Sequence, residues 1–230
     1  MRIDEQSCTS CELCVPYCPM GAIRMDGIAS IDQDECVECG VCRRSGVCPT
    51  NSFYQPTLAW PRQIRAMLSD QTYRAPGAPP HTSDGMKIGD VTGRYRLGEA
   101  ALMVELGRPG IGARFRDLEM VTQALAGHGY KVSDGLSVAR FIADPITGRV
   151  KDDVRNEKAS RISVQYAIPV GQVAALWQSL QEIAPQVNTV ISVGVMRRFE
   201  PDGSLPDLGV PVYPNGKINV GLGQPRAREA

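Results

Sequence analysis

The residues of this chain that could do chemistry are its eight cysteines, which all lie within the first fifty residues. They form two runs of similar spacing, Cys8-x2-Cys11-x2-Cys14-x3-Cys18-Pro19 and Cys36-x2-Cys39-x2-Cys42-x5-Cys48-Pro49. Thiolates at close spacing can bind iron–sulfur clusters or zinc, and cysteines can also form disulfides. Three cysteines separated by two residues lie on one tight loop and can bind three irons of a cubane. A fourth ligand must then come from elsewhere in the chain.

The two runs, each ending in Cys-Pro, resemble the ligand motifs of bacterial ferredoxins that carry two [4Fe–4S] clusters. The resemblance covers about the first 53 residues. In that family the fourth cysteine of each motif binds the cluster of the other motif. Carried over, the resemblance implies one cluster on Cys8, Cys11, Cys14 and Cys48, and another on Cys36, Cys39, Cys42 and Cys18.

The second run departs from the family pattern, because five residues separate its last two cysteines where the first run has three. The longer loop contains Arg43 and Arg44, whose positive charge should raise the potential of a nearby cluster if they face it. Pro49 still follows the last cysteine, so we expect that cysteine to remain a ligand. Structural zinc, other cluster types and disulfides are the alternatives to two [4Fe–4S] clusters.

Composition excludes several classes of protein. The chain has 230 residues, of which 43% are hydrophobic, enough for a packed core in one or two domains. Its formal net charge is zero, which argues against nonspecific binding of nucleic acid. No stretch approaches the roughly 20 apolar residues of a membrane span, and the N-terminus has no secretory signal. We therefore expect a cytoplasmic protein, where thiols stay reduced.

The charge is unevenly distributed. Residues 1–52 hold four arginines against eight acidic side chains, so the remainder of the chain is mildly basic. The acidic first region could dock onto the basic remainder, or it could steer towards a basic partner. Ordinary scatter of surface charge is an equally good explanation.

The cysteine runs must be positioned by short elements. Residues 1–53 are predicted to form the ferredoxin-type domain. Within it, residues 1–52 are an internal duplication, and Asp26-Gly27 between two short apolar runs predicts a hairpin linking the copies. Residues 54–97 form a Pro- and Gly-rich connector with one short helix predicted from Pro61 to Ser69. For Tyr73 to Arg96 we expect a tether on the protein's own surface or a subunit contact, rather than a segment across a binding groove.

Residues 98–200 are predicted to form a second domain, so that the whole chain is α+β. The expected strands are 100–106, 137–143, 160–168 and 189–199, and the expected helices are 113–126 and 171–184. This order is that of a split-βαβ, or ferredoxin-like, sandwich, a name that refers only to the fold. Residues 201–230, rich in proline but also apolar, are expected to form an extended C-terminal arm on a partner subunit.

Outside the cysteines, candidate sites are weak. The turn Gly107-x2-Gly110-x-Gly112, with Arg108 and Arg114, could bind an anion, but we favour a glycine-rich turn that packs a helix onto a sheet. His128 follows a helix end and is expected to be a solvent-exposed cap. No serine–histidine–acid set, flavin motif or nicotinamide motif is present, so no catalytic residue is assigned.

The favoured function is therefore an electron-transfer subunit. It would pass single electrons through two [4Fe–4S] clusters, between a low-potential donor or acceptor and a catalytic subunit of a cytoplasmic oxidoreductase complex. In that case the chain itself is not the catalyst and works within a hetero-oligomer. A stand-alone reductase that binds a small anionic substrate beside the clusters is one alternative. A redox-sensing regulatory protein is the other.

Overall fold

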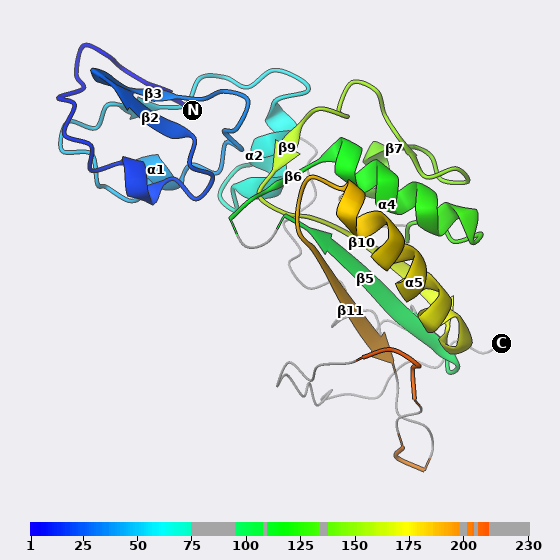
Figure 1. Ribbon diagram of the computed structural model, residues 1–230. Coiled ribbons are helices and arrows are strands. Elements are labelled where there is room, and N and C mark those ends of the chain that lie inside the picture. Colours follow the sequence, from blue (N-terminus) through cyan, green and yellow to red (C-terminus); the bar gives the residue numbers. More distant parts are fainter. Residues whose placement is uncertain (75–94, 108–109, 134–137, 198–201, 205–206, 212–230) are drawn as a thin grey trace.

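A computed structural model describes residues 1–74, 95–107, 110–133, 138–197, 202–204 and 207–211. The chain has two lobes, with the short helix α2 (Gln63–Ser69) between them (Figure 1). We call residues 1–54 the head, and helix α2 together with the described residues from 95 onward the body. All eight cysteines lie in the head, so the head must build the site.

Small antiparallel ladders hold the head together. β1 (Arg2–Ile3) pairs with β4 (Phe53–Tyr54), which brings the two ends of the head side by side. β2 (Ile23–Asp26) and β3 (Ile28–Ile31) form the predicted hairpin, and Gly27 at its turn has φ of +70°, which glycine adopts without steric cost. The remaining elements are a 3-10 turn, η1 (Val15–Tyr17), and the short helix α1 (Val41–Arg44). The core of the head consists of Met1, Cys14, Ile23, Ala29 and Phe53.

Helix α2 belongs to the body by its packing. The helix predicted from Pro61 begins at Gln63. Its Ile64 is fully buried and forms part of the body core, and Leu68 packs against that core. Because α2 is anchored in this way, the polar side chains on its other side are held in a fixed position relative to the body.

The body is built on a three-stranded antiparallel sheet. β5 (Glu99–Leu106) lies in the centre, with β10 (Ile162–Pro169) and β11 (Ile191–Arg197) on either side. The register places Val104 opposite both Val164 and Val193. Three of the four expected strands are thus present in one sheet, close to their predicted ranges.

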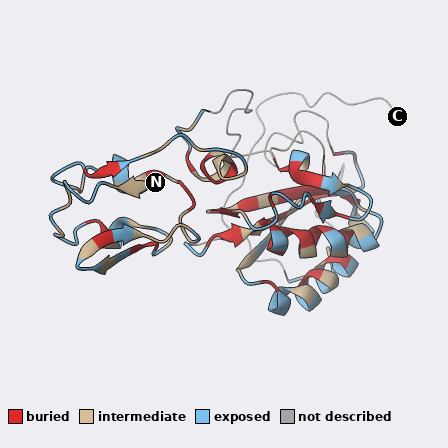
Figure 2. Cartoon of the chain, turned by 90° about the horizontal axis from the view of Figure 1, so that it is seen from above, coloured by how far each residue is buried: buried red, intermediate tan, exposed pale blue. Residues whose placement is uncertain are grey.

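Two helices, α4 (Phe115–Gly127) and α5 (Val173–Ile183), cover one face of this sheet (Figure 2). Short 3-10 turns flank α5 at both ends, η3 (Val170–Gln172) and η4 (Ala184–Gln186). Alternate residues of each strand face the helices, as the two-residue period of a strand requires. The main residues of this core are Leu102, Val104, Leu106, Phe115, Leu118, Val121, Leu125, Val164, Tyr166, Ile168, Leu176 and Leu180.

The strand expected at 137–143 is only partly present, because just the last two of its described residues, Ile142 and Ala143, are in a strand. Ala139–Phe141 forms a 3-10 turn, η2, and β7 (Ile142–Asp144) pairs with β8 (Arg149–Val150) instead of joining the sheet. The turn that follows Asp144 reverses the chain early, and the hairpin then packs its apolar side chains on α4. β10 is an edge strand of the sheet, and at this edge the backbone N–H of Ser133 donates a hydrogen bond of 2.8 Å to Gln165 O.

A second small ladder lies at the end of the body nearest α2. β6 (Ala113–Arg114) pairs with β9 (Lys158–Ala159), so the helix predicted to begin at residue 113 begins at Phe115. The Asp117 carboxylate accepts a hydrogen bond of 3.0 Å from the backbone N–H of Arg114 and closes the first turn of α4. The ladder presents its charged side chains to the head.

The expected C-terminal arm falls mostly outside the described residues, as does most of the stretch from Tyr73 to Arg96. Where the arm is described, Leu208 and Val210 pack against the core of the body. Their apolar side chains therefore have a place within this chain. Among the described residues, no helix is long and apolar enough to cross a membrane.

Candidate functional site

The cysteines line two separate cavities in the head. The outer cavity is lined by Cys8, Cys11, Cys14 and Cys48, together with apolar residues such as Ile3 and Phe53. The inner cavity is lined by Cys18, Cys36, Cys39 and Cys42, with Met20 and Val37 among its neighbours. Each cavity therefore combines three cysteines of one run with the last cysteine of the other run.

The backbone of the two runs shows why the thiols surround a cavity. Ser10 and Glu12 have φ of +54° and +62°, and the equivalent Glu38 and Gly40 have φ of +56° and +68°. Left-handed conformations of non-glycine residues are costly and persist only where the surroundings hold them. Here they turn each ligand loop around its cavity, at the same positions in both copies.

Backbone N–H groups point at the last sulfur of each run. Ala22 N–H donates to Cys18 Sγ at 3.2 Å, and Ser52 N–H donates to Cys48 Sγ at 3.3 Å. Both amides belong to the fourth residue after the cysteine, so the duplication extends to the hydrogen bonds. Such bonds to sulfur stabilise negative charge and tune the potential of a bound cluster.

The thiols differ in acidity. Burial raises the pKa of Cys42 to about 12, and the neighbouring thiols of Cys39 and Cys36 add to the effect. Burial also raises the pKa of Cys48, but hydrogen bonds from Thr50 and Ser52 outweigh it and lower that pKa to about 7. Iron binds thiolate, so a bound cluster would supply the positive charge that the buried thiols lack.

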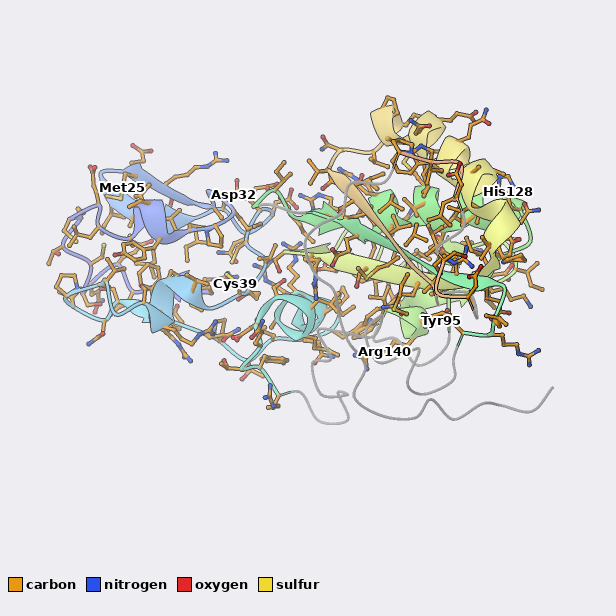
Figure 3. The ribbon with its side chains drawn as sticks, turned by 90° about the horizontal axis from the view of Figure 1, so that it is seen from below. Met25, Asp32, Cys39, Tyr95, His128 and Arg140 are labelled. Atoms are coloured by element: carbon orange, nitrogen blue, oxygen red, sulfur yellow. The ribbon has the colours of Figure 1, made fainter. Side chains whose placement is uncertain are left out.

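The inner cavity lies on the side of the head that faces the body. Figure 3 shows Cys39 on that side, with Asp32 at the border between the lobes. Glu38, in the same ligand loop, is fully buried and forms ion pairs with the Met1 amino group and with Arg62 beside α2. Burial alone would raise the pKa of Glu38, but these two cations outweigh it and lower the pKa. Glu38 thus joins the ligand loop to the segment that carries α2.

The longer loop of the second run has a structural use that sequence reasoning missed. Residues 41–44 form α1, and the Arg44 side chain turns back to donate to Cys39 O at 2.7 Å. It also forms an ion pair of 2.8 Å with Asp70, at the end of α2. Arg44 therefore ties the loop to the connector, while Arg43 is exposed to solvent. No short sequence pattern signals the ion pair, because Arg44 and Asp70 lie far apart in the chain.

The acidic head does dock on the body. Arg114 of β6 pairs with Asp34 at 2.7 Å and with Glu35 at 3.1 Å. Lys158 of β9 also pairs with Glu35. The structure therefore shows docking of the acidic region onto the rest of the same chain, one of the two uses proposed for the charge asymmetry. Arg114 takes part in these ion pairs, so its charge is already paired with carboxylates of the head.

The glycine-rich turn packs closely between the lobes. A methyl group on Gly112 would lie 2.9 Å from Ala159 O and 3.1 Å from Met20 Sδ, and one on Gly110 would lie 3.4 Å from Pro19 O. At Gly112 only a residue without a side chain fits this approach, as the packing interpretation requires. Arg108 lies outside the described residues. His128 is exposed after α4, with Nε2 2.6 Å from Ser179 Oγ, as expected for a cap.

The alternatives to a cluster can be compared with this geometry. A structural zinc site needs four donors that converge on one ion. All eight cysteines lie in the part of the chain that the structure describes, and none of them forms a disulfide. The eight thiols instead surround two extended cavities, an arrangement that suits a polynuclear cluster with one thiolate on each iron.

Comparison with known proteins agrees with this arrangement. Residues 1–24 match the family model described as a 4Fe-4S binding domain. The chain is 47% identical to a ferredoxin-like protein in the vnf region of Azotobacter chroococcum over 60 residues, which are 24% of this chain and 92% of the relative. No solved structure matches the chain.

Two further relatives are named as subunits of larger enzymes. One is pyruvate synthase subunit PorD of Methanocaldococcus jannaschii, 40% identical over 53 residues, which are 22% of this chain and 59% of the relative. The other is a subunit of an ion-translocating oxidoreductase complex of Methanosarcina acetivorans, 44% identical over 50 residues, which are 21% of this chain and 18% of the relative. The chain thus spans less than two thirds of either of these two proteins.

The cysteine loops and the matching model define an iron–sulfur protein with at least one 4Fe–4S cluster. Because this chain covers nearly all of a relative that is 47% identical, it belongs to the family of ferredoxin-like 4Fe–4S proteins through its N-terminal region. It is accordingly an electron carrier of the ferredoxin-like type.

Proposed function

We propose that this chain is the iron–sulfur subunit of a cytoplasmic oxidoreductase complex and carries two [4Fe–4S] clusters, one in each cavity. The observation that carries the proposal is the composition of the cavities. The outer one holds three cysteines of the first run with Cys48, and the inner one holds three cysteines of the second run with Cys18. This is the crossed ligand set that the family resemblance implies.

In this function the residues of the chain hold and tune the clusters. Eight thiolates bind the irons, and the amides of Ala22 and Ser52 stabilise negative charge on two of the ligand sulfurs. A bound [4Fe–4S] cluster supplies one-electron chemistry. Because the two cysteine loops lie in one small lobe, electrons can pass from one centre to the other. The apolar residues that line each cavity limit the access of water to the cluster.

A partner protein is part of the proposal, because the sequence shows no catalytic residue set beside the cysteine motifs. The names of two relatives, subunits of pyruvate synthase and of an ion-translocating complex, support a role within a hetero-oligomer. The donor or acceptor outside the complex would be a low-potential one-electron carrier. The body would serve as the surface that holds the head against the catalytic subunit.

The first test is metal content and low-temperature EPR spectroscopy of the full chain after anaerobic purification. Two [4Fe–4S] clusters predict about eight irons and eight sulfides per chain, with signals from two interacting reduced centres. About four irons per chain would contradict the two-cluster proposal. Isolation from the native source, with the body intact, should also bring down a catalytic subunit, and a chain that elutes alone as a monomer would contradict the partner.

A further inference from the structure

The body holds a buried arginine against the ligand loop of the inner cavity. Arg65 of α2 is 5% exposed. Its Nη1 donates to the backbone oxygens of Gln33, Asp34 and Cys36 at 3.1, 2.8 and 2.9 Å. Its Nε donates to the carboxylate of Glu157, in the loop before β9, at 2.5 Å. One guanidinium thus joins three carbonyls of the head to a carboxylate of the body.

The position of Arg65 is set by the body, not by the head. The neighbouring residue Ile64 is fully buried in the body core, and Glu157 N–H donates to Val154 O within the body. The charge of Arg65 is therefore held at a fixed place when the head forms its cluster loops. A buried charge of this kind is tolerated because it is paired with a carboxylate and donates to several backbone carbonyls.

Contacts of this type are confined to one of the two cavities. In the described parts of the chain, the hydrogen bonds and ion pairs from the body and from residues 62–72 end on residues between Gln33 and Arg44, beside the inner cavity. None of them ends on Cys8, Cys11, Cys14 or Cys48. The body can therefore act on the inner centre without acting directly on the outer one.

A fixed ion pair beside a cluster acts on the electron that the cluster gains. Reduction adds one negative charge, which a nearby guanidinium stabilises and a nearby carboxylate destabilises. Arg65 is the nearer partner, because it touches the carbonyl of the ligand Cys36, whereas Glu157 lies behind it. Burial weakens solvent screening of both charges.

We propose that Arg65 is a positioning residue for the inner cluster, and that the body tunes the reduction potential of this cluster through the Arg65–Glu157 pair. The inference rests on the proposed two-cluster function. It gives the body a role in the electron transfer itself, since the body makes the inner and outer centres inequivalent and so biases the centre on which an added electron resides.

The test is an EPR-monitored redox titration of the full chain in two charge-removing variants. Arg65→Gln should lower the midpoint potential of the inner cluster, and Glu157→Gln should raise it by a smaller amount. The outer cluster should keep its potential in both. Its signal is assigned with Cys11→Ser, which removes a ligand of the outer cavity. Arg161→Gln is the matched control, because it breaks an Arg–Glu pair of 3.0 Å within the body and should move neither potential.

Opposite shifts confined to the inner cluster would establish the proposal. Shifts of the same sign in the two variants, equal shifts of both clusters, or loss of the inner cluster in Arg65→Gln with no shift in Glu157→Gln would overturn it. Failure of the proposed function is recognised separately, because a wild-type chain with a single cluster signal would show it before any variant is made.

Discussion

At the residue scale, the distinctive feature of this protein is that the last cysteine of each run lines the cavity of the other run. Cys18 belongs by sequence to the first run but lies at the inner cavity, and Cys48 belongs to the second run but lies at the outer one. The arrangement interlocks the two copies. Under the proposed function, loss of Cys18 or Cys48 should therefore damage the centre built mainly by the opposite run.

This crossing gives a direct prediction. Cys18→Ser and Cys36→Ser should weaken the same EPR signal, and Cys48→Ser should weaken the signal that Cys8→Ser weakens. If the chain carries the two four-iron clusters that we propose, each variant should lower the iron content towards about four per chain, because one cluster loses a thiolate. Pairing of Cys18→Ser with Cys8→Ser instead would show that each run binds its own cluster.

A buried tyrosine of the sheet offers a second prediction. Burial raises the pKa of Tyr166, whose hydroxyl finds no hydrogen-bond partner among the described residues. Tyr166→Phe should therefore raise the free energy of unfolding by about 1 kcal/mol, because an unsatisfied buried hydroxyl is costly.

Tyr95→Phe is the matched change. The Tyr95 hydroxyl donates to Gln165 Oε1 at 3.1 Å, so its removal should lower the free energy of unfolding by about 1 kcal/mol. Chemical denaturation of the full chain, followed by circular dichroism, measures both variants. A loss of stability in Tyr166→Phe would mean that its hydroxyl is hydrogen-bonded after all.

At the element scale, the body departs from the expected sandwich where β7 and β8 fold onto α4. The contact is close at Gly148, where an added methyl group would lie 2.3 Å from Thr122 O. The Thr122 hydroxyl in turn donates to Gly148 O at 2.5 Å. The hairpin can lie on the helix only because this residue has no side chain and adopts φ of +75°.

Gly148→Ala should therefore lower the free energy of unfolding by about 3 kcal/mol or more, since it adds a steric clash to backbone strain. Gly129→Ala isolates the strain, because Gly129 also has positive φ, +83°, but nothing lies within 4 Å of the added methyl group. It should cost about 1 kcal/mol. Thermal unfolding of both variants measures the difference, and equal losses would contradict the close packing of the hairpin.

At the scale of the whole molecule, the head is fastened to the body by charge. The two partners of Arg114 in the head are Asp34, which is largely exposed, and Glu35. Arg114→Glu would place three carboxylates together, and like charges in a contact cost on the order of several kcal/mol. We expect the head to move away from the body, with a larger radius of gyration in small-angle X-ray scattering.

The control for this prediction is Arg149→Glu. Arg149 pairs with Asp152 on the exposed surface of the body, and such exposed pairs contribute little. This variant should leave the radius of gyration unchanged. If Arg114→Glu also left it unchanged in low salt, the contact between the lobes would have to depend on α2 and the glycine-rich turn rather than on these charges.

The sequence by itself determined the local features of this protein. Cysteine spacing indicated the cluster chemistry, Asp26-Gly27 predicted the β2–β3 hairpin, and periodicity located α5 and three strands of the sheet. These features depend on neighbours within a few residues along the chain. Local geometry is therefore enough to specify them.

Only the tertiary structure decided which distant groups meet. It placed Arg65 on the carbonyl of Cys36, turned Arg44 to Asp70, and paired Arg114 with the acidic head. In the structure β7 and β8 also pair with each other and pack on α4, instead of joining the sheet. Such contacts join residues far apart in sequence. They depend on burial and on the fit of whole surfaces, which no short pattern of residues encodes.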